Sequence, residues 1–435
     1  MGSLAHGAPS AESGVRTAAL IGSGCATKML EAHATHAGDL IFVEAACLAL
    51  CQLTAPMAGA DERVESLVKA GALPLLVAAL HSHAYASLPL AQSAVCAARN
   101  LLAREDAVGQ ARRQGVCDIM LPVELVRAMQ AHPADAVVQH IATSTSDTDT
   151  KAVWRKEAVV DANALPALVS AMGLVGEGSA GVSEQAARAL ATIVAGTDKL
   201  GLARKEKAYD AHAIPALVVA MRGHASLPNN QEACCYALRN ICFGTGDRPN
   251  VQRKSEAVEC GALAAAVLAM STHSESAGMQ AAGCGAITSI GFGSDNLNSH
   301  VFTLSFAQLA LDANALPAVL QAMGKFTGQI RVQEQGVKAL RNLAYGGDKK
   351  AALVQQEMAA QGAIEAIVCA MNTFPGDAPM HVDACKAIEF ICDTGGAAQK
   401  RANAANARQA IAASMRHFKD NAHLQEAAAH AMHTI

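Results

Sequence analysis

The chain of 435 residues has few aromatic residues, few charges and no long apolar run. Aromatic residues make up 3% of it and charged residues make up 17%. No apolar run reaches the roughly 20 residues that span a membrane, and residues 1–15 lack the basic and then apolar segments of a signal peptide. The formal net charge is −4 and no long basic run is present, so we expect no binding to nucleic acid through its phosphates.

The sequence also lacks the motifs of the common enzyme classes. It contains no H-E-x-x-H, G-x-S-x-G, P-loop or kinase signature. The segment GEGSAG at 176–181 matches G-x-G-x-x-G, but a predicted helix precedes it, whereas a dinucleotide site needs a strand there. We therefore expect a protein that is not an enzyme and that binds no cofactor and no small-molecule ligand.

Cysteine and histidine are the remaining candidates for site chemistry. The 13 cysteines show no paired spacing, which favours small core residues in a reducing compartment over a disulfide framework or a metal site. Among the 16 histidines, His430 and His433 lie three residues apart on one predicted helix, but no third ligand accompanies them. The expected location is cytoplasmic, and we expect no bound metal.

What the sequence does contain is an internal repeat from about residue 71 onward. The segment AIPALVVAMRGHASLPNNQEACCYALRNI at 213–241 recurs at 315–343 as ALPAVLQAMGKFTGQIRVQEQGVKALRNL. A marker residue closes the first long helix of each unit, 43 to 53 residues after the previous marker: Leu80, Met129, Met172, Met221, Met270, Met323, Met371 and Met415. Only the unit around Met129 departs from the rest of the pattern, and a degenerate ninth unit is expected to end in ALCQL at 49–53. A period of this length predicts a stack of similar units whose function belongs to a surface.

Each unit is predicted to contain one short and two longer helices. A turn residue followed by alanine stands nine residues before most markers: Gly71, Asn163, His212, Gly261, Asn314, Gly362 and Asn406. We expect these residues to form left-handed corners between the first and second helices. After the third helix, a glycine and then an aspartate, such as Gly196 and Asp198, predict a helix end followed by the N-cap of the next short helix.

The motifs G-A-[LI]-P-x-L-V in the second helix and A-L-x-N-L in the third resemble those of armadillo repeat proteins, over nearly all of residues 20–435. The resemblance implies an all-α, right-handed α-solenoid of about eight to nine three-helix repeats. We expect a flexible N-terminus at 1–19 and a single solenoid domain at 20–435, with a last repeat that lacks a polar cap. HEAT-type helix pairs are the nearest alternative, and the A-L-x-N-L segments argue against them.

The resemblance also implies where a partner binds. In armadillo proteins the third helices line a concave groove, and the asparagine of A-L-x-N-L bonds the backbone of an extended peptide. We call the residues at this position the amide row: Gln52, Asn100, Thr192, Asn240, Ser289, Asn342, Phe390 and Thr434. An amide suits a strand-like ligand because it offers both a donor and an acceptor, although a bond to the protein's own chain is the alternative.

One helical turn before the amide row, on the same face, lies a second set of residues. We call it the preceding row: Leu48, Cys96, Arg188, Tyr236, Gly285, Lys338, Lys386 and His430. Tyr236 is the strongest candidate anchor, and Arg188, Lys338 and Lys386 make the expected groove basic. The tryptophan array of nuclear-import receptors is missing, because the single tryptophan, Trp154, lies elsewhere.

We therefore predict an interaction scaffold or adaptor that holds an extended, acidic or neutral segment of a protein partner in this groove. The predicted contact residues are Asn100, Asn240, Asn342, Tyr236, Arg188, Lys338, Lys386, Ser289 and Thr192. Two alternatives stay open. One is a regulatory armadillo region of a larger signalling enzyme, such as a kinase or GTPase, and the other is a structural component of a cytoskeletal or ciliary assembly.

Overall fold

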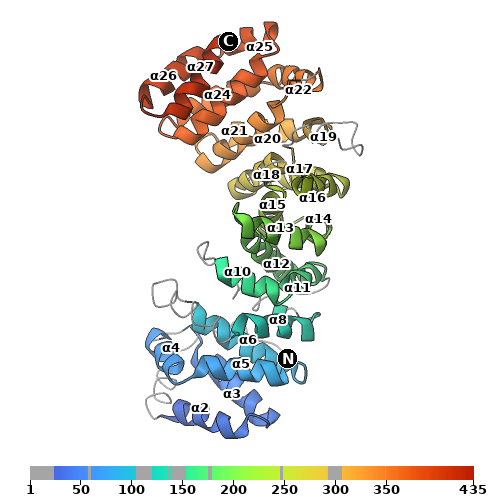
Figure 1. The fold of residues 1–435 in the computed structure, drawn as a ribbon, viewed down its shortest axis with the longest axis vertical. Coiled ribbons are helices and arrows are strands. Elements are labelled where there is room, and N and C mark those ends of the chain that lie inside the picture. The colour runs from blue at the N-terminus through green and yellow to red at the C-terminus, as the bar shows by residue number, and fades with distance from the viewer. Residues whose placement is uncertain are drawn as a thin grey trace. The chain divides into compact units, whose positions relative to one another are not determined.

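A computed structural model describes most of the chain, and every element in the described part is an α-helix (Figure 1). The described residues are 24–56, 60–103, 120–135, 137–139, 153–174, 179–244, 248–291, 306–347 and 349–435. The predicted flexible N-terminus at 1–19 lies outside them. The prediction of an all-α fold is confirmed.

The helices follow one another in the predicted groups of three. The first repeat contributes α2 (Cys25–His36) and α3 (Leu40–Leu53), and α8 (Leu121–Ala131) represents the repeat around Met129. Two complete repeats of the N-terminal half are α4 (Ala60–Lys69), α5 (Ala72–His83), α6 (Leu88–Leu102), and α10 (Val153–Asp161), α11 (Ala164–Met172), α12 (Ser179–Ile193). The next are α13 (Lys199–Asp210), α14 (Ala213–Gly223), α15 (Pro228–Cys242), and α16 (Arg248–Glu259), α17 (Ala262–Thr272), α18 (Ala277–Ile290). The last three are α19 (Phe306–Asp312), α20 (Ala315–Lys325), α21 (Ile330–Ala344), then α22 (Lys349–Ala360), α23 (Ala363–Thr373), α24 (Ala378–Cys392), and α25 (Gly396–Ala404), α26 (Ala407–His417), α27 (Ala422–Thr434).

The corner before each second helix is left-handed, as predicted. The seven predicted corner residues have φ between +58° and +96°. Met120, nine residues before Met129, joins them with φ of +63°, although its side chain makes this conformation unfavourable. The repeat around Met129 therefore shares the backbone frame of the other repeats.

In five repeats a glutamine holds the end of the second helix to the third, and sequence reasoning missed it. The Nε2 of Gln231 donates to the carbonyls of Met221 at 2.8 Å and His224 at 3.0 Å. The same pair of bonds recurs from Gln139, Gln280, Gln333 and Gln425, each ten residues after its marker. The second carbonyl of each pair also accepts the backbone amide three residues later, such as that of Leu227 for His224. The glutamine is therefore needed chiefly by the carbonyl of the marker residue, near the helix end.

The first helices bury long polar side chains against the ends of third helices. Arg253 of α16 is 1% exposed, and its Nε donates to the carbonyl of Ile241 at 2.9 Å. Arg204 of α13 likewise donates to the carbonyl of Ala195 at 3.0 Å, and Gln355 of α22 to that of Ala344 at 2.7 Å. Helix C-terminal carbonyls carry the negative end of the dipole, so a cation there is favourable. The predicted N-cap Asp198 is confirmed, because its carboxylate accepts a bond from the amide of Gly201 at 2.9 Å.

Further contacts to backbone carbonyls lie within a repeat and between repeats. The Nζ of Lys205, on α13, donates to the carbonyl of Phe243 at the end of α15 at 3.0 Å. Burial and then the nearby Arg253 guanidinium lower the pKa of Lys205 to about 8. On the opposite, second-helix side, His132 and His273 bond through Nε2 to the carbonyls of Ala84 and Ala225 in the preceding repeats, at 2.6 and 2.8 Å.

By its internal contacts the chain divides into Met1–Ile193 and Val194–Ile435, here called the N-terminal and C-terminal units. The division falls between α12 and α13, at a repeat boundary. The single domain over 20–435 stays a prediction. No single helix of the described residues is both long and apolar enough to span a membrane; the bent pair α4–α5 meets this test only when its two helices are taken together.

Candidate protein-binding face

The amide row and the preceding row lie on third helices that pack directly against one another within each unit. In the C-terminal unit α15 packs on α18, α18 on α21, α21 on α24 and α24 on α27, and in the N-terminal unit α3 packs on α6. We call the solvent-facing side formed by these two rows the third-helix face. Because the rows keep the same phase in every repeat, side chains on neighbouring helices come together on it.

In the N-terminal unit, the predicted site residues mostly bond to their own chain. Asn100 is half-buried, and its Nδ2 donates to the hydroxyl of Thr54 in the preceding repeat at 3.4 Å. Arg188 is exposed and forms an ion pair at 3.0 Å with Glu184, one turn earlier on α12. The Thr192 hydroxyl donates to the carbonyl of Arg188 at 3.1 Å. Of these three residues, Arg188 presents the most reachable side chain.

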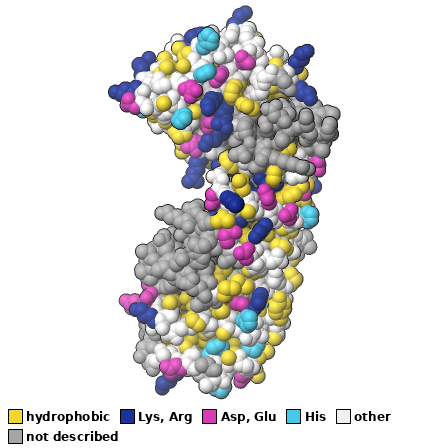
Figure 2. Space-filling view, in the orientation of Figure 1, with side chains coloured by type: hydrophobic (Ala, Val, Ile, Leu, Met, Phe, Trp, Pro, Cys, Tyr) yellow, Lys and Arg dark blue, Asp and Glu magenta, His cyan; other side chains and the backbone are white. Residues whose placement is uncertain are grey.

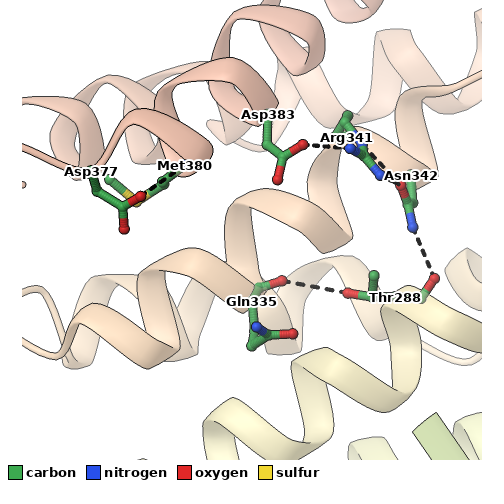
Figure 3. A network of polar contacts seen from close by, with 7 residues as sticks. All are labelled: Thr288, Gln335, Arg341, Asn342, Asp377, Met380 and Asp383. Atoms are coloured by element: carbon green, nitrogen blue, oxygen red, sulfur yellow. Dashed lines mark hydrogen bonds and ion pairs between the residues drawn. The ribbon is translucent and has the colours of Figure 1, made fainter. Parts of the chain in front are cut away.

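Asn342 forms the centre of a polar network between three third helices (Figure 3). Its Nδ2 donates to the carbonyl of Thr288 on α18 at 3.0 Å, and its Oδ1 accepts from Nε of Arg341 at 3.0 Å. Arg341 in turn forms an ion pair with Asp383 on α24. Asn342 is 6% exposed, so the amide acts first on the protein itself and positions Arg341.

The third-helix face of α18 carries almost no side chain of its own. Ser289 is 5% exposed, and the preceding row has glycine at 285. A Cβ added to Gly285 would lie 2.9 Å from Cδ of Arg239 and 3.4 Å from Oε1 of Gln335. The side chains of α15 and α21 therefore extend over α18 from both sides, and Ser289 contributes little reachable surface.

The remaining predicted residues are more accessible. Tyr236 and Asn240 are half-buried on α15, Lys338 is half-buried on α21, and Lys386 is exposed on α24. Figure 2 shows Lys and Arg side chains gathered on the C-terminal unit in the region of α21 and α24. The basic character predicted for the face is thus concentrated on these two helices.

An aromatic pair that sequence reasoning did not assign lies at the ends of the two helices that carry these lysines. Tyr345 follows α21 and is 48% exposed, and Phe390 stands in the amide row of α24. Their ring centres are 5.5 Å apart with planes at 76°, an edge-to-face contact that suits two aromatic rings. An exposed tyrosine is among the residues that most often anchor a binding partner.

Acidic groups flank this surface, and their surroundings raise the pKa of two of them. Burial and then a hydrogen bond with Asp377, the N-cap of α24, raise the pKa of Glu334, while Lys338 opposes that rise. Burial also raises the pKa of Glu389, and His430, whose Nδ1 lies 3.6 Å from its Oε1, lowers it. The carboxylates of Glu334 and Asp377 repel each other when both are ionised.

Replacing Glu334 with glutamine is expected to stabilise the protein at pH 7 by about 0.2–1 kcal/mol, because the change removes one charge from a like-charged pair at the surface. A carboxyl group whose folded pKa is raised costs stability as the pH rises from its unfolded pKa through its folded pKa. The difference between variant and wild type should therefore shrink as the pH falls towards 4, which thermal unfolding at several pH values measures. Glu426→Gln, at the corresponding, exposed position of α27, is the matched control; an equal effect there would contradict the prediction.

A small pocket lies on the other side of the C-terminal unit, between α14 and α17. It encloses about 150 Å³ and is lined mainly by apolar side chains such as Ala265 and Leu268. Its one charged residue, Arg222, donates to the carbonyl of Cys260 at 2.9 Å. Within the described residues no group of three or more His, Cys, Asp or Glu side chains is placed to hold a metal ion.

Comparison with known proteins supports the fold and not a particular activity. No family model and no curated protein matches the sequence. Among solved structures, an engineered protein from a structural genomics consortium is 20% identical, with a TM-score of 0.72 over 94% of this chain and 88% of its own. A designed armadillo repeat protein is 19% identical, with a TM-score of 0.50 over 62% of this chain and 99% of its own. The chain therefore has an armadillo-type repeat fold.

Proposed function

We propose that the chain is a protein-interaction scaffold that binds an extended, acidic segment of a partner along the third-helix face of its C-terminal unit. The observation that carries this proposal is the contact of the exposed Tyr345 with Phe390 at the ends of two adjacent third helices, α21 and α24, which also carry Lys338 and Lys386. An aromatic edge gives a partner side chain an apolar contact, and the lysines of the same two helices attract the acidic residues of the partner.

The amide row supports this function in two ways. Asn240, half-buried on α15, is the member that we assign to the backbone of the partner. Asn342 instead orients Arg341 through two bonds, from Nε at 3.0 Å and from Nη2 at 2.7 Å, and so holds a guanidinium between α21 and α24. In this proposal Asn100, Thr192 and Ser289 stabilise contacts between or within repeats, and Arg188 adds a basic contact on the N-terminal unit.

Reversing the charge of Lys338 and Lys386 together is expected to weaken binding of an acidic peptide by about 10- to 100-fold, since both charges attract the same ligand. The probe is a fluorescent ten-residue peptide of alternating Glu and Tyr, measured by anisotropy at two salt concentrations. Adding Tyr345→Ala should reduce binding further.

The matched control reverses Lys400 and Lys419, which are exposed away from the third-helix face. A basic peptide of equal length serves as the second control. If the wild type binds the basic peptide as well as the acidic one, or if both lysine pairs have equal effects, the proposed site is wrong. Circular dichroism should show unchanged helix content, because both lysines lie at the surface.

A further inference from the structure

Two cysteines from neighbouring repeats meet on the third-helix face of the N-terminal unit. Cys51 lies on α3 and Cys96 on α6, and these two helices pack directly against each other. The two thiols are hydrogen-bonded to each other, and both residues are half-buried and free. Cys96 belongs to the preceding row, and Cys51 stands immediately before the amide-row residue Gln52.

The repeat itself explains why these positions touch. In the C-terminal unit the corresponding residues of α15 and α18 are Arg239 and Gly285, and Cδ of Arg239 lies 2.9 Å from the place of a Cβ on Gly285. The residue before the amide row of one third helix thus lies against the preceding row of the next. With a cysteine at each position, the two sulfur atoms are brought within reach of a bond.

The surroundings make the Cys96 thiol more reactive than the Cys51 thiol. The hydrogen bond from Cys51 and the Arg99 guanidinium lower the pKa of Cys96, while the same hydrogen bond and burial raise the pKa of Cys51. Elsewhere, burial raises the pKa of Cys235 and Cys284 to about 12, as expected for inert core thiols. A thiolate beside an arginine, with a second thiol next to it, is the arrangement of an oxidisable pair.

We propose that Cys51 and Cys96 form a redox-sensitive modification site, in which a peroxide oxidises Cys96 and Cys51 then closes a disulfide between α3 and α6. The Cys96 thiol reacts with hydrogen peroxide to give a sulfenic acid and one water. The Cys51 sulfur then attacks the Cys96 sulfur, the S–S bond forms, and the sulfenic oxygen leaves as a second water. The two thiols lose two electrons in all, the peroxide gains them, and a thiol reductant reverses the change.

The test treats the reduced full-length chain with hydrogen peroxide, stops the reaction with catalase and blocks the remaining thiols with N-ethylmaleimide. Cys96 lies in the tryptic peptide 70–99, and Cys51 lies in 29–63 together with Cys47. Mass spectrometry should find these two peptides linked, with fragmentation assigning the bond to Cys51. Without peroxide, iodoacetamide at pH 7 should label Cys96 about tenfold faster than the exposed Cys369, because more of Cys96 is thiolate.

Two serine variants distinguish a redox-sensitive site from two cysteines that are merely in contact. In Cys51→Ser a dimedone adduct should appear on Cys96 and no cross-link should form, whereas in Cys96→Ser peroxide should leave Cys51 reduced. Circular dichroism confirms that each variant is folded. The proposal is overturned if Cys96 is labelled no faster than Cys369, or if peroxide yields no Cys51–Cys96 bond in the folded wild type.

Discussion

Replacing Gln231 with leucine is expected to lower the free energy of unfolding by about 1–3 kcal/mol, because the buried carbonyl of Met221 loses its side-chain donor, whereas the carbonyl of His224 keeps the amide of Leu227 at 3.0 Å. Gln231 is 2% exposed, and its amide bonds the carbonyls of Met221 and His224 at 2.8 and 3.0 Å. Leucine fills nearly the same space but donates nothing. Urea unfolding measures the loss, and hydrogen exchange should show α14 and α15 opening first, because each repeat contacts mainly its neighbours.

A matched variant and a control make the Gln231 prediction specific. His381 occupies the corresponding place in α24, where its Nε2 bonds the carbonyl of Phe374 at 3.1 Å. Gln231→His should therefore recover part of the lost stability. Gln361→Leu removes an exposed amide bonded to Glu357 at 2.7 Å and should cost less than about 0.5 kcal/mol. Equal losses for Gln231→Leu and Gln361→Leu would show that the two carbonyl bonds are not what stabilises the repeat.

The repeat frame could be predicted from the sequence because its signals are local. A residue with positive φ needs a glycine or an asparagine in most cases, so corners such as Gly261 and Asn314 are visible in the chain itself. Met120 shows the limit of this reasoning. It adopts φ of +63° without such a residue type, because the packing of the repeat outweighs the local preference.

The glutamine bonds have a signal in the sequence. A glutamine ten residues after a methionine marker recurs in five repeats, including Gln139, which places the irregular repeat around Met129 in register. Buried arginines were harder to foresee, because Arg and Lys are rarely fully buried in proteins. The pair Arg-Lys at 204–205 and again at 253–254 was the available clue.

The contacts across the third-helix face could not be predicted from one repeat at a time. Asn342 is buried because Thr288, 54 residues earlier, and Arg341 both bond to its side chain. Tyr345 meets Phe390 only because α21 packs on α24. The sequence therefore indicates which rows form the face, whereas the neighbouring repeats decide which members of each row stay accessible.

Replacing Arg253 with alanine is expected to destabilise the protein by about 3–5 kcal/mol, the largest effect among the changes considered. The side chain is 1% exposed, so its removal leaves a cavity between α15 and α16 and takes the Nε donor from the carbonyl of Ile241, 2.9 Å away. Urea unfolding measures the loss.

Arg222 provides the comparison that separates burial from hydrogen bonding. It also donates to a backbone carbonyl at 2.9 Å, that of Cys260, but this bond is exposed to solvent. Water can replace the lost donor there, so Arg222→Ala should cost less than about 1 kcal/mol. Arg253→Lys should fall between the two alanine variants, because it keeps the charge but loses the planar set of donors. A loss below 1 kcal/mol for Arg253→Ala would mean that solvent enters the repeat and satisfies the end of α15, and that the buried arginine is not what holds the third helix in place.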